Sequence, residues 1–484
     1  MRTLTNYIDG RHLPPASGAY LDVIEPATGG VLARVPDSGR DDINAAVTAA
    51  SAAFTSWSTR SPAERSEVLL RIAEGIDARL DELAVAESRD TGKPISLART
   101  VDIPRAAANF RYFATAILHT ESAMHDMGRD CFNYTLRKPR GVAGLISPWN
   151  LPLYLLTWKI APAIATGNTC VCKPSEVTPL TAFLLCDIMA QAGLPPGVVN
   201  IVHGLGASTG GVLVTHPDVP TVSFTGSTKV GQWIAEHAGR MLKRVSLELG
   251  GKNPYIVFDD APIDLTLDNA VRAAFSNQGQ ICLCGSRFLI QESIADKFVE
   301  SFVERAQSLR VGDPMEATTQ HGAQTSREQL AKIESFIQAA REQGGELLLG
   351  GVRVAPDRLP PRCKDGLFFE PTVIRGLSND CRVIQEEIFG PVVTIQTFRD
   401  EQEAVSLANS TPYGLAASIW TNDLNRAHRM GAHVDSGIIW INCWMVRDLR
   451  TPFGGMKQSG VGREGGNEAL RFFTEPKNIC VRMV

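Results

Sequence analysis

The chain has 484 residues, of which 44% are hydrophobic and 21% charged, and its formal net charge at pH 7 is -4. This length predicts two to four domains, each large enough to bury its own core. The composition is typical of a soluble globular enzyme, and the small net charge gives no reason to expect nucleic acid or an anionic membrane as a partner.

The N-terminal segment MRTLTNYIDGRHLPP and the cysteines predict the compartment. This segment lacks the apolar core of a signal peptide, and no later run reaches the roughly 18 uncharged apolar residues of a membrane span. The cysteines are scattered through apolar segments, such as Cys170 and Cys172 in one predicted strand, so we expect reduced thiols rather than disulfides. Neither Cys-x-Cys pair has a further cysteine or histidine at zinc spacing. We therefore expect a cytoplasmic protein with no metal site.

The spacing of apolar residues changes along residues 1–139. Residues 1–40 alternate short apolar runs with glycine and proline, which predicts hairpins. From Asp41 to about Gly92 the apolar residues recur at a helical period, which predicts amphipathic helices. A further helix is expected after Pro104, because proline is common in the first helical turn. Residues 118–139 are polar and irregular.

Between Gly141 and Gly250 short apolar runs alternate with helical segments. Strands are predicted at 141–147, 168–174, 198–204, 221–226 and 244–249, with helices at 153–165, 178–193 and 229–239. This alternation indicates a parallel sheet covered by helices, with ligands at the carboxyl ends of its strands. A second strand and helix series runs from Lys252 to about Gly455, and a shift in composition at Gly250-Gly251 marks the expected domain boundary.

Three residues with useful chemistry stand where the chain leaves a predicted element. Cys282 lies in FSNQGQICLCGSR, between an apolar helix and a glycine. Glu248 ends an apolar strand-like run in VSLELGGKNP, and Asn150 follows another strand in SPWNLP. An ionised thiol is a nucleophile, a carboxylate is a general base, and an amide donates to an oxygen that gains negative charge. Taken alone, Cys282 is more often a buried inert cysteine.

The signals for a cofactor are modest when taken alone. A Rossmann G-x-G-x-x-G is not found where a strand turns into a helix, and the near match GLGAS is too short. Gly226 and Ser227, in FTGSTKVG, follow a strand and open a helix, so their backbone N–H groups could receive a pyrophosphate. Lys173 and Glu176, in CKPSE, follow another strand, where a solvated loop is the more common interpretation.

Five motifs together, GQIC followed by SR, LELGGK, PWNLP, EEIFGP and PFGGMKQSGVGRE, resemble the aldehyde dehydrogenase superfamily over nearly the whole chain. The resemblance implies an α/β fold with a Rossmann-like, parallel-sheet NAD-binding domain at 1–117 and 140–250 and an α/β catalytic domain at 251–458. It also implies a small β oligomerisation segment formed by 118–139 and 459–484. The protein is accordingly expected to be a homodimer or homotetramer.

The resemblance also implies roles for individual residues. Cys282 attacks the aldehyde, Asn150 and the Cys282 backbone N–H hold the oxyanion, and Glu248 deprotonates the water that hydrolyses the thioester. Cys284 is expected to be a bystander. Residues that the resemblance places at NAD are Trp149, Lys173, Glu176, Gly226, Ser227, Leu249, Glu387 and Phe389. Because Lys173 and Glu176 would contact the adenosine ribose, where a carboxylate repels a 2'-phosphate, NAD is expected rather than NADP.

Within the superfamily, SPWNLPLYLLTWKIAPA and WMVRDLRTPFGG are most similar to the 2-aminomuconate and 2-hydroxymuconate semialdehyde dehydrogenases and their animal relative acting on retinal or aminomuconate semialdehyde. Betaine aldehyde dehydrogenases are the alternative. Substrate contacts are expected from Arg105, Arg447, Tyr154, Trp158 and Phe453. The motifs do not separate the amino from the hydroxy substrate.

We expect Arg105 and Arg447 to hold a carboxylate at the far end of the substrate, because two guanidinium forks suit one carboxylate. Arg105 follows Pro104 at the expected first turn of a helix, where the backbone dipole disfavours a cation and an anionic ligand would relieve the cost. Asp102 and Asp448 are the alternative partners, because they are near in sequence.

Two other classes of function remain open. A CoA-acylating aldehyde dehydrogenase would resolve the same thioester with CoA, but it needs no base at Glu248. A non-enzymatic structural relative, such as a lens crystallin, would not need Cys282, Glu248 and Asn150 together. An NAD-dependent absorbance assay separates these classes.

Overall fold

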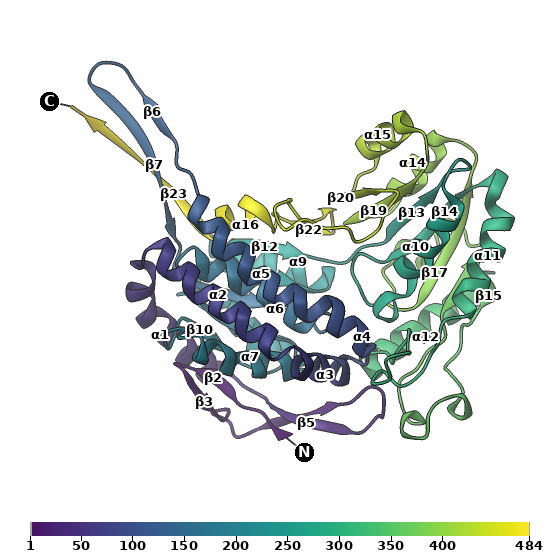
Figure 1. The fold of residues 1–484 in the computed structure, drawn as a ribbon, viewed down its shortest axis with the longest axis horizontal. Coiled ribbons are helices and arrows are strands. Elements are labelled where there is room, and N and C mark those ends of the chain that lie inside the picture. The colour runs from purple at the N-terminus through teal and green to yellow at the C-terminus, as the bar shows by residue number, and fades with distance from the viewer. Residues whose placement is uncertain (1, 484) are drawn as a thin grey trace.

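Two sheets, each covered by helices, form the two halves of the computed structural model, which describes residues 2–483 (Figure 1). The first sheet consists, in spatial order, of β22 (Gly460–Val461), β12 (Arg244–Glu248), β11 (Thr221–Thr225), β8 (Val142–Ile146), β9 (Thr169–Lys173), β10 (Val199–Ile201), β2 (Asn6–Ile8) and β3 (Arg11–Leu13). Strands β12, β11, β8, β9 and β10 are parallel, which confirms the predicted α/β sheet.

The strand order of the first sheet reverses between β8 and β11. From β8 the chain continues to β9 and β10 on one side, and it then crosses to β11 and β12 on the other. Helices diverge from such a point, so they leave a crevice at the carboxyl ends of the two strands. The segments that follow β8 and β11, which carry Asn150 and Gly226, therefore lie beside this crevice.

Helices on the first sheet bury both of its faces. They are α1 (Arg40–Ser58), α2 (Pro62–Ala78), α3 (Leu80–Thr91), α6 (Pro152–Ala165), α7 (Leu180–Gln191), α8 (Gly211–Thr215) and α9 (Thr228–Arg240). Helix α6 is buried at every residue, because α5 (Ile103–Ala116) and α2 pack over it. The predicted helices at 41–92, 153–165, 178–193 and 229–239 are confirmed. Within residues 2–483, no helix is long and apolar enough to cross a membrane.

Helix α5 continues an earlier helical run. It is preceded by α4 (Ile95–Leu97) and a π-helical segment at Ala98–Asp102, and Asp102 itself has helical angles (φ -70°, ψ -49°). A π-helical turn is one way to accommodate the N–H that Pro104 lacks. Arg105 therefore does not occupy the first turn of a free helix end. The argument that the helix dipole disfavours a cation at Arg105 is wrong.

The second sheet is also mostly parallel. It consists, in spatial order, of β15 (Glu346–Leu349), β16 (Thr372–Arg375), β17 (Val392–Phe398), β14 (Gly285–Gln291), β13 (Asn253–Val257), β19 (Ala416–Trp420) and β20 (Ile438–Ile441). Only β15 pairs antiparallel to its neighbour among these described strands. Its main helices are α10 (Ile263–Phe275), α11 (Ala295–Gln307), α12 (Arg327–Glu342), α14 (Glu401–Asn409) and α15 (Leu424–His433). The predicted second strand and helix series is confirmed.

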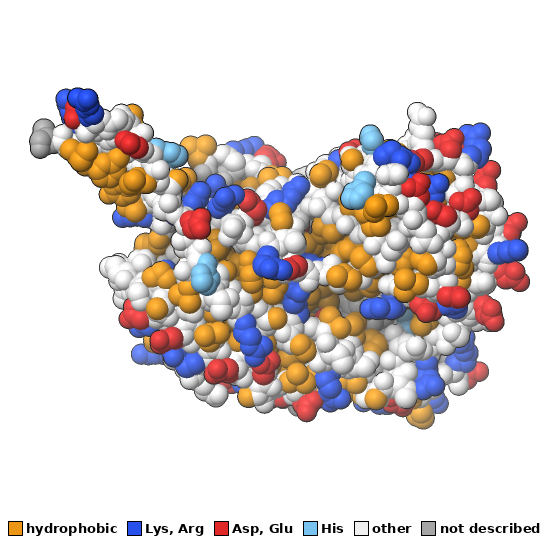
Figure 2. Space-filling model, turned by 45° about the horizontal axis from the view of Figure 1, so that its top comes forward, with side chains coloured by type: hydrophobic (Ala, Val, Ile, Leu, Met, Phe, Trp, Pro, Cys, Tyr) orange, Lys and Arg blue, Asp and Glu red, His pale blue; other side chains and the backbone are white. Residues whose placement is uncertain are grey.

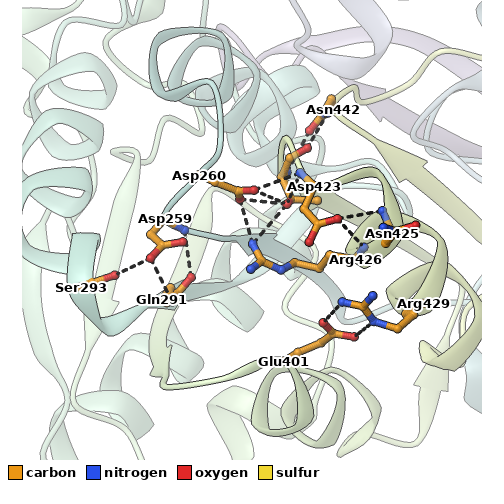
Figure 3. A network of polar contacts seen from close by, with 11 residues as sticks. Asp259, Asp260, Gln291, Ser293, Glu401, Asp423, Asn425, Arg426, Arg429 and Asn442 are labelled. Carbon is orange, nitrogen blue, oxygen red and sulfur yellow. Dashed lines mark hydrogen bonds and ion pairs between the residues drawn. The ribbon is translucent and has the colours of Figure 1, made fainter.

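A network of polar contacts fixes α15 to the end of the second sheet (Figure 3). The Asp260 carboxylate, just after β13, accepts hydrogen bonds from the Arg426 guanidinium (2.9 Å) and the Thr421 hydroxyl (2.8 Å). Asp423 caps the helix, because its side chain accepts from the backbone N–H groups of Asn425 (2.8 Å) and Arg426 (3.1 Å). The start of α15 is therefore tied to two neighbouring strand ends.

Two smaller β structures complete the fold. In the first, β4 (Tyr20–Ile24) and β5 (Val31–Pro36) form a hairpin with β1 (Arg2–Thr3) beside it. Strands β2 and β3, at the edge of the first sheet, form a second hairpin. The hairpins predicted for residues 1–40 are therefore confirmed. In the second, β7 (Cys131–Pro139) lies between β6 (Met124–Asp126) and the tail strand β23 (Thr474–Arg482). These three strands form an arm that projects from the body, with the C-terminus near its tip (Figure 1).

The arm bears on two expectations. Residues 118–139 contribute β6 and β7, in line with the β segment that the resemblance implied, although their polar composition gives no strand pattern. The segment 459–484 contributes β23 to the arm, but its first residues form β22, which pairs with β12 in the first sheet. The domain boundaries given from the sequence stay predictions.

Candidate active site

Two cavities meet at Cys282, between the carboxyl edge of the first sheet and a loop that precedes β14 of the second. One cavity is lined by residues that include Trp149, Asn150, Gly226, Ser227, Leu249, Cys282, Glu387 and Phe389. The other is lined by residues that include Tyr154, Glu248, Leu249, Cys282, Arg447 and Phe453. The fold thus brings the predicted nucleophile, base and amide donor to one place, with separate space on each side.

A tight turn presents Cys282. Helix α10 ends at Phe275, and Asn277, Gln278 and Gly279 then follow with φ angles of 50°, 53° and 72°. Two consecutive non-glycine residues in the left-handed region are strained, and such strain persists only where neighbours hold it. Buried hydrogen bonds do so here, from Asn277 to the Gln280 carbonyl (3.1 Å) and from Gln278 to the Ala323 carbonyl (2.7 Å). The loop therefore fixes the position of the thiol.

The electrostatic surroundings of Cys282 favour the neutral thiol. Burial raises the pKa of Cys282 above its ordinary range, and the charges of Glu387 and Glu248 raise it further, whereas Arg447 lowers it. Arg447 is the one cation among the causes of the shift. Cys284 is buried with its Sγ 3.9 Å from the Ser276 carbonyl, away from either cavity lining.

Glu248, at the end of β12, is suited to act as a base. Its side chain is 3% exposed, and neither carboxylate oxygen has a hydrogen-bond partner within residues 2–483. Burial raises the pKa of Glu248 well above its ordinary value, the nearby Glu464 raises it further, and Lys159 lowers it. A carboxyl group with a raised pKa accepts protons more readily near neutral pH than an ordinary glutamate does.

Lys159 and Glu464 form a buried ion pair beside Glu248 that the sequence did not reveal. The Lys159 ammonium lies 2.7 Å from Glu464 Oε1 and donates to the Ser223 hydroxyl at 2.9 Å. Glu464 also lines the cavity that contains Glu248. The two partners are separated by 305 positions in the chain. No local pattern marks such a pair, although both residues lie inside motifs that carry the resemblance.

Asn150 follows β8 and is 3% exposed. Its side-chain N–H donates to the Gln280 carbonyl at 2.9 Å, and its own carbonyl accepts from the Asn277 amide at 3.1 Å and from Lys93 at 3.0 Å. Asn150 and Cys282 line the same cavity. A neutral amide donor beside the thiol matches what an oxyanion on an attacked carbonyl requires.

The cavity on the far side of Cys282 has features that fit a dinucleotide. Helix α9 begins directly after Gly226 and Ser227, and the Ser227 hydroxyl caps it by accepting from the Val230 N–H (3.4 Å). Glu387 accepts from the Gly251 N–H at 2.9 Å, and a side chain at Gly250 would collide with this carboxylate. The helix start suits a phosphate and the carboxylate suits a ribose hydroxyl.

An aromatic pair closes this cavity. The Phe389 ring lies edge-on to the Trp149 ring, with centroids 5.2 Å apart. Phe389 has a left-handed φ of 62°, and the Gln329 side chain holds that backbone by donating to the Phe389 carbonyl at 2.7 Å. Gln329 and Lys332, both on α12, line the cavity and were not predicted. A polar face on a helix gives no signal that separates cavity from solvent.

Lys173 and Glu176 lie together at the carboxyl end of β9. Their side chains form an ion pair at 2.6 Å, with Lys173 almost fully buried and Glu176 26% exposed. A buried lysine held by a partly exposed glutamate is more ordered than the solvated loop that was the alternative interpretation. The pair follows the strand next to β8, so it lies along the same edge of the sheet as Asn150.

The cavity that contains Glu248 is cationic at its far end. Arg447 donates to the Tyr154 hydroxyl at 2.8 Å, and its guanidinium lies 4.0 Å from the Phe453 ring centre. The Arg105 guanidinium lies 5.4 Å and 5.6 Å from the ring centres of Tyr154 and Trp158. Arg105 and Trp158 are not among the residues that line the cavity itself, but Tyr154 connects them to it.

These two arginines have no carboxylate partner among residues 2–483. Arg105 Nε and Nη2 are buried without a hydrogen-bond partner, and burial lowers the pKa of Arg105, with a smaller lowering by the charge of Arg447. The alternative partners are engaged elsewhere, because Asp102 pairs with Lys93 (2.5 Å) and Asp448 with Arg450 (2.6 Å). Two neighbouring cations in a partly buried site are unfavourable unless an anion joins them.

The chain is similar over its length to known proteins. The model of the Aldehyde dehydrogenase family matches residues 13–479. The 2-aminomuconic semialdehyde dehydrogenase of Danio rerio is 50% identical, over 99% of this chain and 98% of its own. The 2-hydroxymuconic semialdehyde dehydrogenase of Pseudomonas sp. (strain CF600) is 46% identical over the full length of both chains, 100% of each. A crystal structure of PnpE in complex with nicotinamide adenine dinucleotide superposes with a TM-score of 0.97, at 43% identity, over 99% of this chain and 98% of that one.

Proposed function

Because the chain belongs to the aldehyde dehydrogenase family, we propose that it oxidises a carboxylate-bearing semialdehyde, 2-aminomuconate or 2-hydroxymuconate 6-semialdehyde, to the dicarboxylic acid with NAD as acceptor. The observation that carries the proposal is a pair of arginines without a carboxylate partner among residues 2–483: Arg447 lines the cavity shared by Cys282 and Glu248, and Arg105 packs behind Tyr154 of that lining. A carboxylate on the substrate supplies the anion that Arg105 and Arg447 lack. With the carboxylate held there, the aldehyde at the other end of the substrate is directed toward the Cys282 thiol.

The residues of the chain divide the chemistry. The Cys282 thiol loses its proton to solvent, the resulting thiolate adds to the aldehyde carbon, and the Asn150 amide donates to the oxygen that becomes negative. NAD, when bound, supplies the hydride acceptor that turns the adduct into a thioester. Glu248 then removes a proton from a water molecule, the resulting hydroxide adds to the thioester carbonyl, and the Cys282 thiolate leaves as the carboxylic acid forms. Glu248 returns its proton to solvent before the next cycle.

The residues around the second cavity support NAD. Gly226 and Ser227 would hold the pyrophosphate at the start of α9, Glu387 the nicotinamide ribose, and Phe389 with Trp149 the ring. Lys173 and Glu176 would contact the adenosine ribose. The Glu176 carboxylate favours NAD over NADP, because a 2'-phosphate beside it would meet a like charge.

The same observations weigh against the alternatives. Betaine aldehyde carries a fixed positive charge, which Arg105 and Arg447 would repel. A CoA-acylating enzyme needs no unpaired buried base, yet both oxygens of Glu248 are free of partners within residues 2–483. We also propose that the chain assembles as a homodimer or homotetramer through the arm of β6, β7 and β23, and that the NAD-binding and catalytic domains have the boundaries given from the sequence.

Removal of each arginine tests the substrate class. A charge-assisted hydrogen bond contributes roughly 1.5 to 3 kcal/mol, so Arg105→Ala or Arg447→Ala should lower kcat/KM for muconate semialdehydes about 10- to 150-fold. Hexanal, a neutral aldehyde of similar length, should be nearly unaffected. Arg471→Ala is the matched control, because Arg471 is exposed and pairs with Glu468 away from the cavity.

Two outcomes would contradict the substrate assignment. The first is an equal loss of kcat/KM for hexanal and the muconate semialdehydes, which would mean that the arginines maintain the fold rather than bind the carboxylate. The second is a higher kcat/KM for betaine aldehyde than for every carboxylated semialdehyde.

A further inference from the structure

A buried ion cluster lies directly behind Asn150. Lys93, Glu87 and Asp102 are each no more than 1% exposed. The Lys93 ammonium lies 2.5 Å from Asp102 Oδ2 and 3.4 Å from Glu87 Oε1. Its remaining hydrogen-bond partner is the backbone carbonyl of Asn150, at 3.0 Å. One cation therefore uses two carboxylates for charge balance and still reaches the main chain of a residue in the active site.

Two donors hold the Asn150 carbonyl, and they come from different parts of the chain. Lys93 follows α3 in the first half, whereas Asn277 belongs to the strained turn before Cys282 and donates at 3.1 Å. Asn277 also donates to the Gln280 carbonyl, to which the Asn150 side chain donates at 2.9 Å. The Asn150 amide is thus fixed relative to the nucleophile loop, and Lys93 is the charged member of that linkage.

Stability alone does not account for this cluster. Burying an ammonium ion with two carboxylates is costly, and apolar groups of the same volume are often as stable. Burial raises the pKa of Glu87 to about 7 and also raises the pKa of Asp102, so burial disfavours the charged form of both carboxyl groups. A hydrogen bond from a charged donor is shorter and stronger than one from a neutral donor, so an ammonium fixes a carbonyl better than an amide does.

We propose that Lys93 is a positioning residue for aldehyde oxidation: by holding the Asn150 carbonyl, it keeps the Asn150 amide where the oxyanion forms. The proposal rests on the proposed function, because it acts through the role of Asn150. Lys93 is not itself among the residues that line either cavity, and Asn150 is the lining residue to which it donates. Its effect on the reaction must therefore pass through Asn150.

A double-mutant cycle tests this dependence. Lys93→Met removes the donor and keeps the length of the side chain. It should lower kcat/KM for the semialdehyde on the order of 10- to 100-fold, because a small displacement of a catalytic group has a cost of this size. In an Asn150→Ala background the same change should have no more than about a twofold effect, because the group that Lys93 positions is absent. For variants too slow for a steady-state assay, NADH formation is measured in a single turnover with enzyme in excess.

Matched variants separate positioning from folding. Lys243→Met is the control. Lys243 is also buried, and it donates to the backbone carbonyl of His216, away from Cys282. If Lys93→Met does not fold, Lys93→Met with Asp102→Asn removes both charges and takes its place in the cycle. NAD affinity, measured by quenching of tryptophan fluorescence, should stay within about twofold in Lys93→Met and Lys243→Met, because neither lysine lines the cavity that would hold NAD.

Each outcome decides the proposal. Equal losses from Lys93→Met in the native and Asn150→Ala backgrounds would overturn it, as would native kcat/KM in the Lys93 variant. A loss of NAD affinity parallel to the loss of kcat/KM would also overturn it, since a general disturbance of the site would then be responsible. Native activity in Asn150→Ala alone would refute the oxyanion role in the proposed function, which the cycle thereby distinguishes from a failure of Lys93.

Discussion

Cys282 and Glu248 lie on opposite halves of the molecule, one in the loop before β14 and the other at the end of β12, yet they line one cavity. Their proposed roles are separable in time, because hydride transfer precedes hydrolysis of the thioester. Cys282→Ala should abolish turnover. Glu248→Gln should still give one burst of NADH per active site, and mass spectrometry should then show an acylated Cys282.

The opposite result is equally informative. If Glu248→Gln gives neither burst nor adduct, then Glu248 is required before hydride transfer, and its assignment as the base for hydrolysis is wrong. Cys284→Ala is the control for the thiol, because Cys284 is buried outside both cavity linings and should keep native kcat.

The ion pair of Lys159 and Glu464 predicts a pH effect. Burial and the Glu464 charge raise the pKa of Glu248, so the base is protonated at low pH and the hydrolysis rate rises as the pH increases through that pKa. Glu464→Gln removes a negative charge and leaves Lys159 unpaired, and both changes favour the ionised base. The midpoint of the rising limb, measured from the decay of the acyl-enzyme, should therefore move to lower pH.

Glu468→Gln serves as the control for this pH effect, since Glu468 lies four positions further on and pairs with Arg471 away from the cavity. A midpoint that moves equally in both variants, or moves upward in Glu464→Gln, would show that Glu464 does not set the pKa of Glu248.

At the scale of elements, the start of α15 provides a local test of the fold. Asp423 accepts from two backbone N–H groups of the first turn, and loss of such a cap costs about 0.5 to 2 kcal/mol. Asp423→Ala should therefore speed hydrogen exchange in residues 424–433 about 2- to 30-fold, because exchange there follows local opening. Asp423→Asn keeps the acceptor and should exchange nearly as slowly as the native chain. Equal acceleration in both variants would mean that charge rather than capping stabilises the turn.

At the scale of the whole molecule, the arm carries hydrophobic side chains that are exposed to solvent in the single chain. Met124, Met127 and Leu136 are 67%, 59% and 36% exposed, and orange side chains cover much of the projecting arm in Figure 2. Strands β6 and β23 also leave both edges of this small sheet unpaired within residues 2–483. Exposed apolar surface and free edges are typical of an interface between subunits.

Charged residues on the arm should disrupt assembly. Met124→Glu combined with Leu136→Glu should shift the sedimentation coefficient from that of a dimer or tetramer toward that of a monomer. Leu424→Glu is the control, because Leu424 is 71% exposed on α15, in the other half of the molecule. A native chain that sediments as a monomer, or a double variant that sediments unchanged, would rule out the arm as the interface.

The elements, the fold class and the residue types of the site were accessible from local patterns and motifs in the chain. Strand and helix alternation is a local property of the chain, so the parallel sheets and most helices could be predicted from period and turn residues. The motifs around Cys282, Glu248 and Asn150 carried the family resemblance. Side-chain direction on the arm could not be predicted, because both faces of a projecting ribbon meet solvent and no apolar alternation marks them.

Which charges face each other depends on three-dimensional packing and could not be read from the chain. The sequence offered Asp102 as a partner for Arg105, but Asp102 turns inward to Lys93, and Arg105 is left facing Tyr154 and Trp158. Lys93 reaches the Asn150 carbonyl across 57 positions, and Lys159 reaches Glu464 across 305. Such pairs depend on how whole helices and strands pack, and Coulomb interactions in a buried site depend on distance in space rather than on separation along the chain.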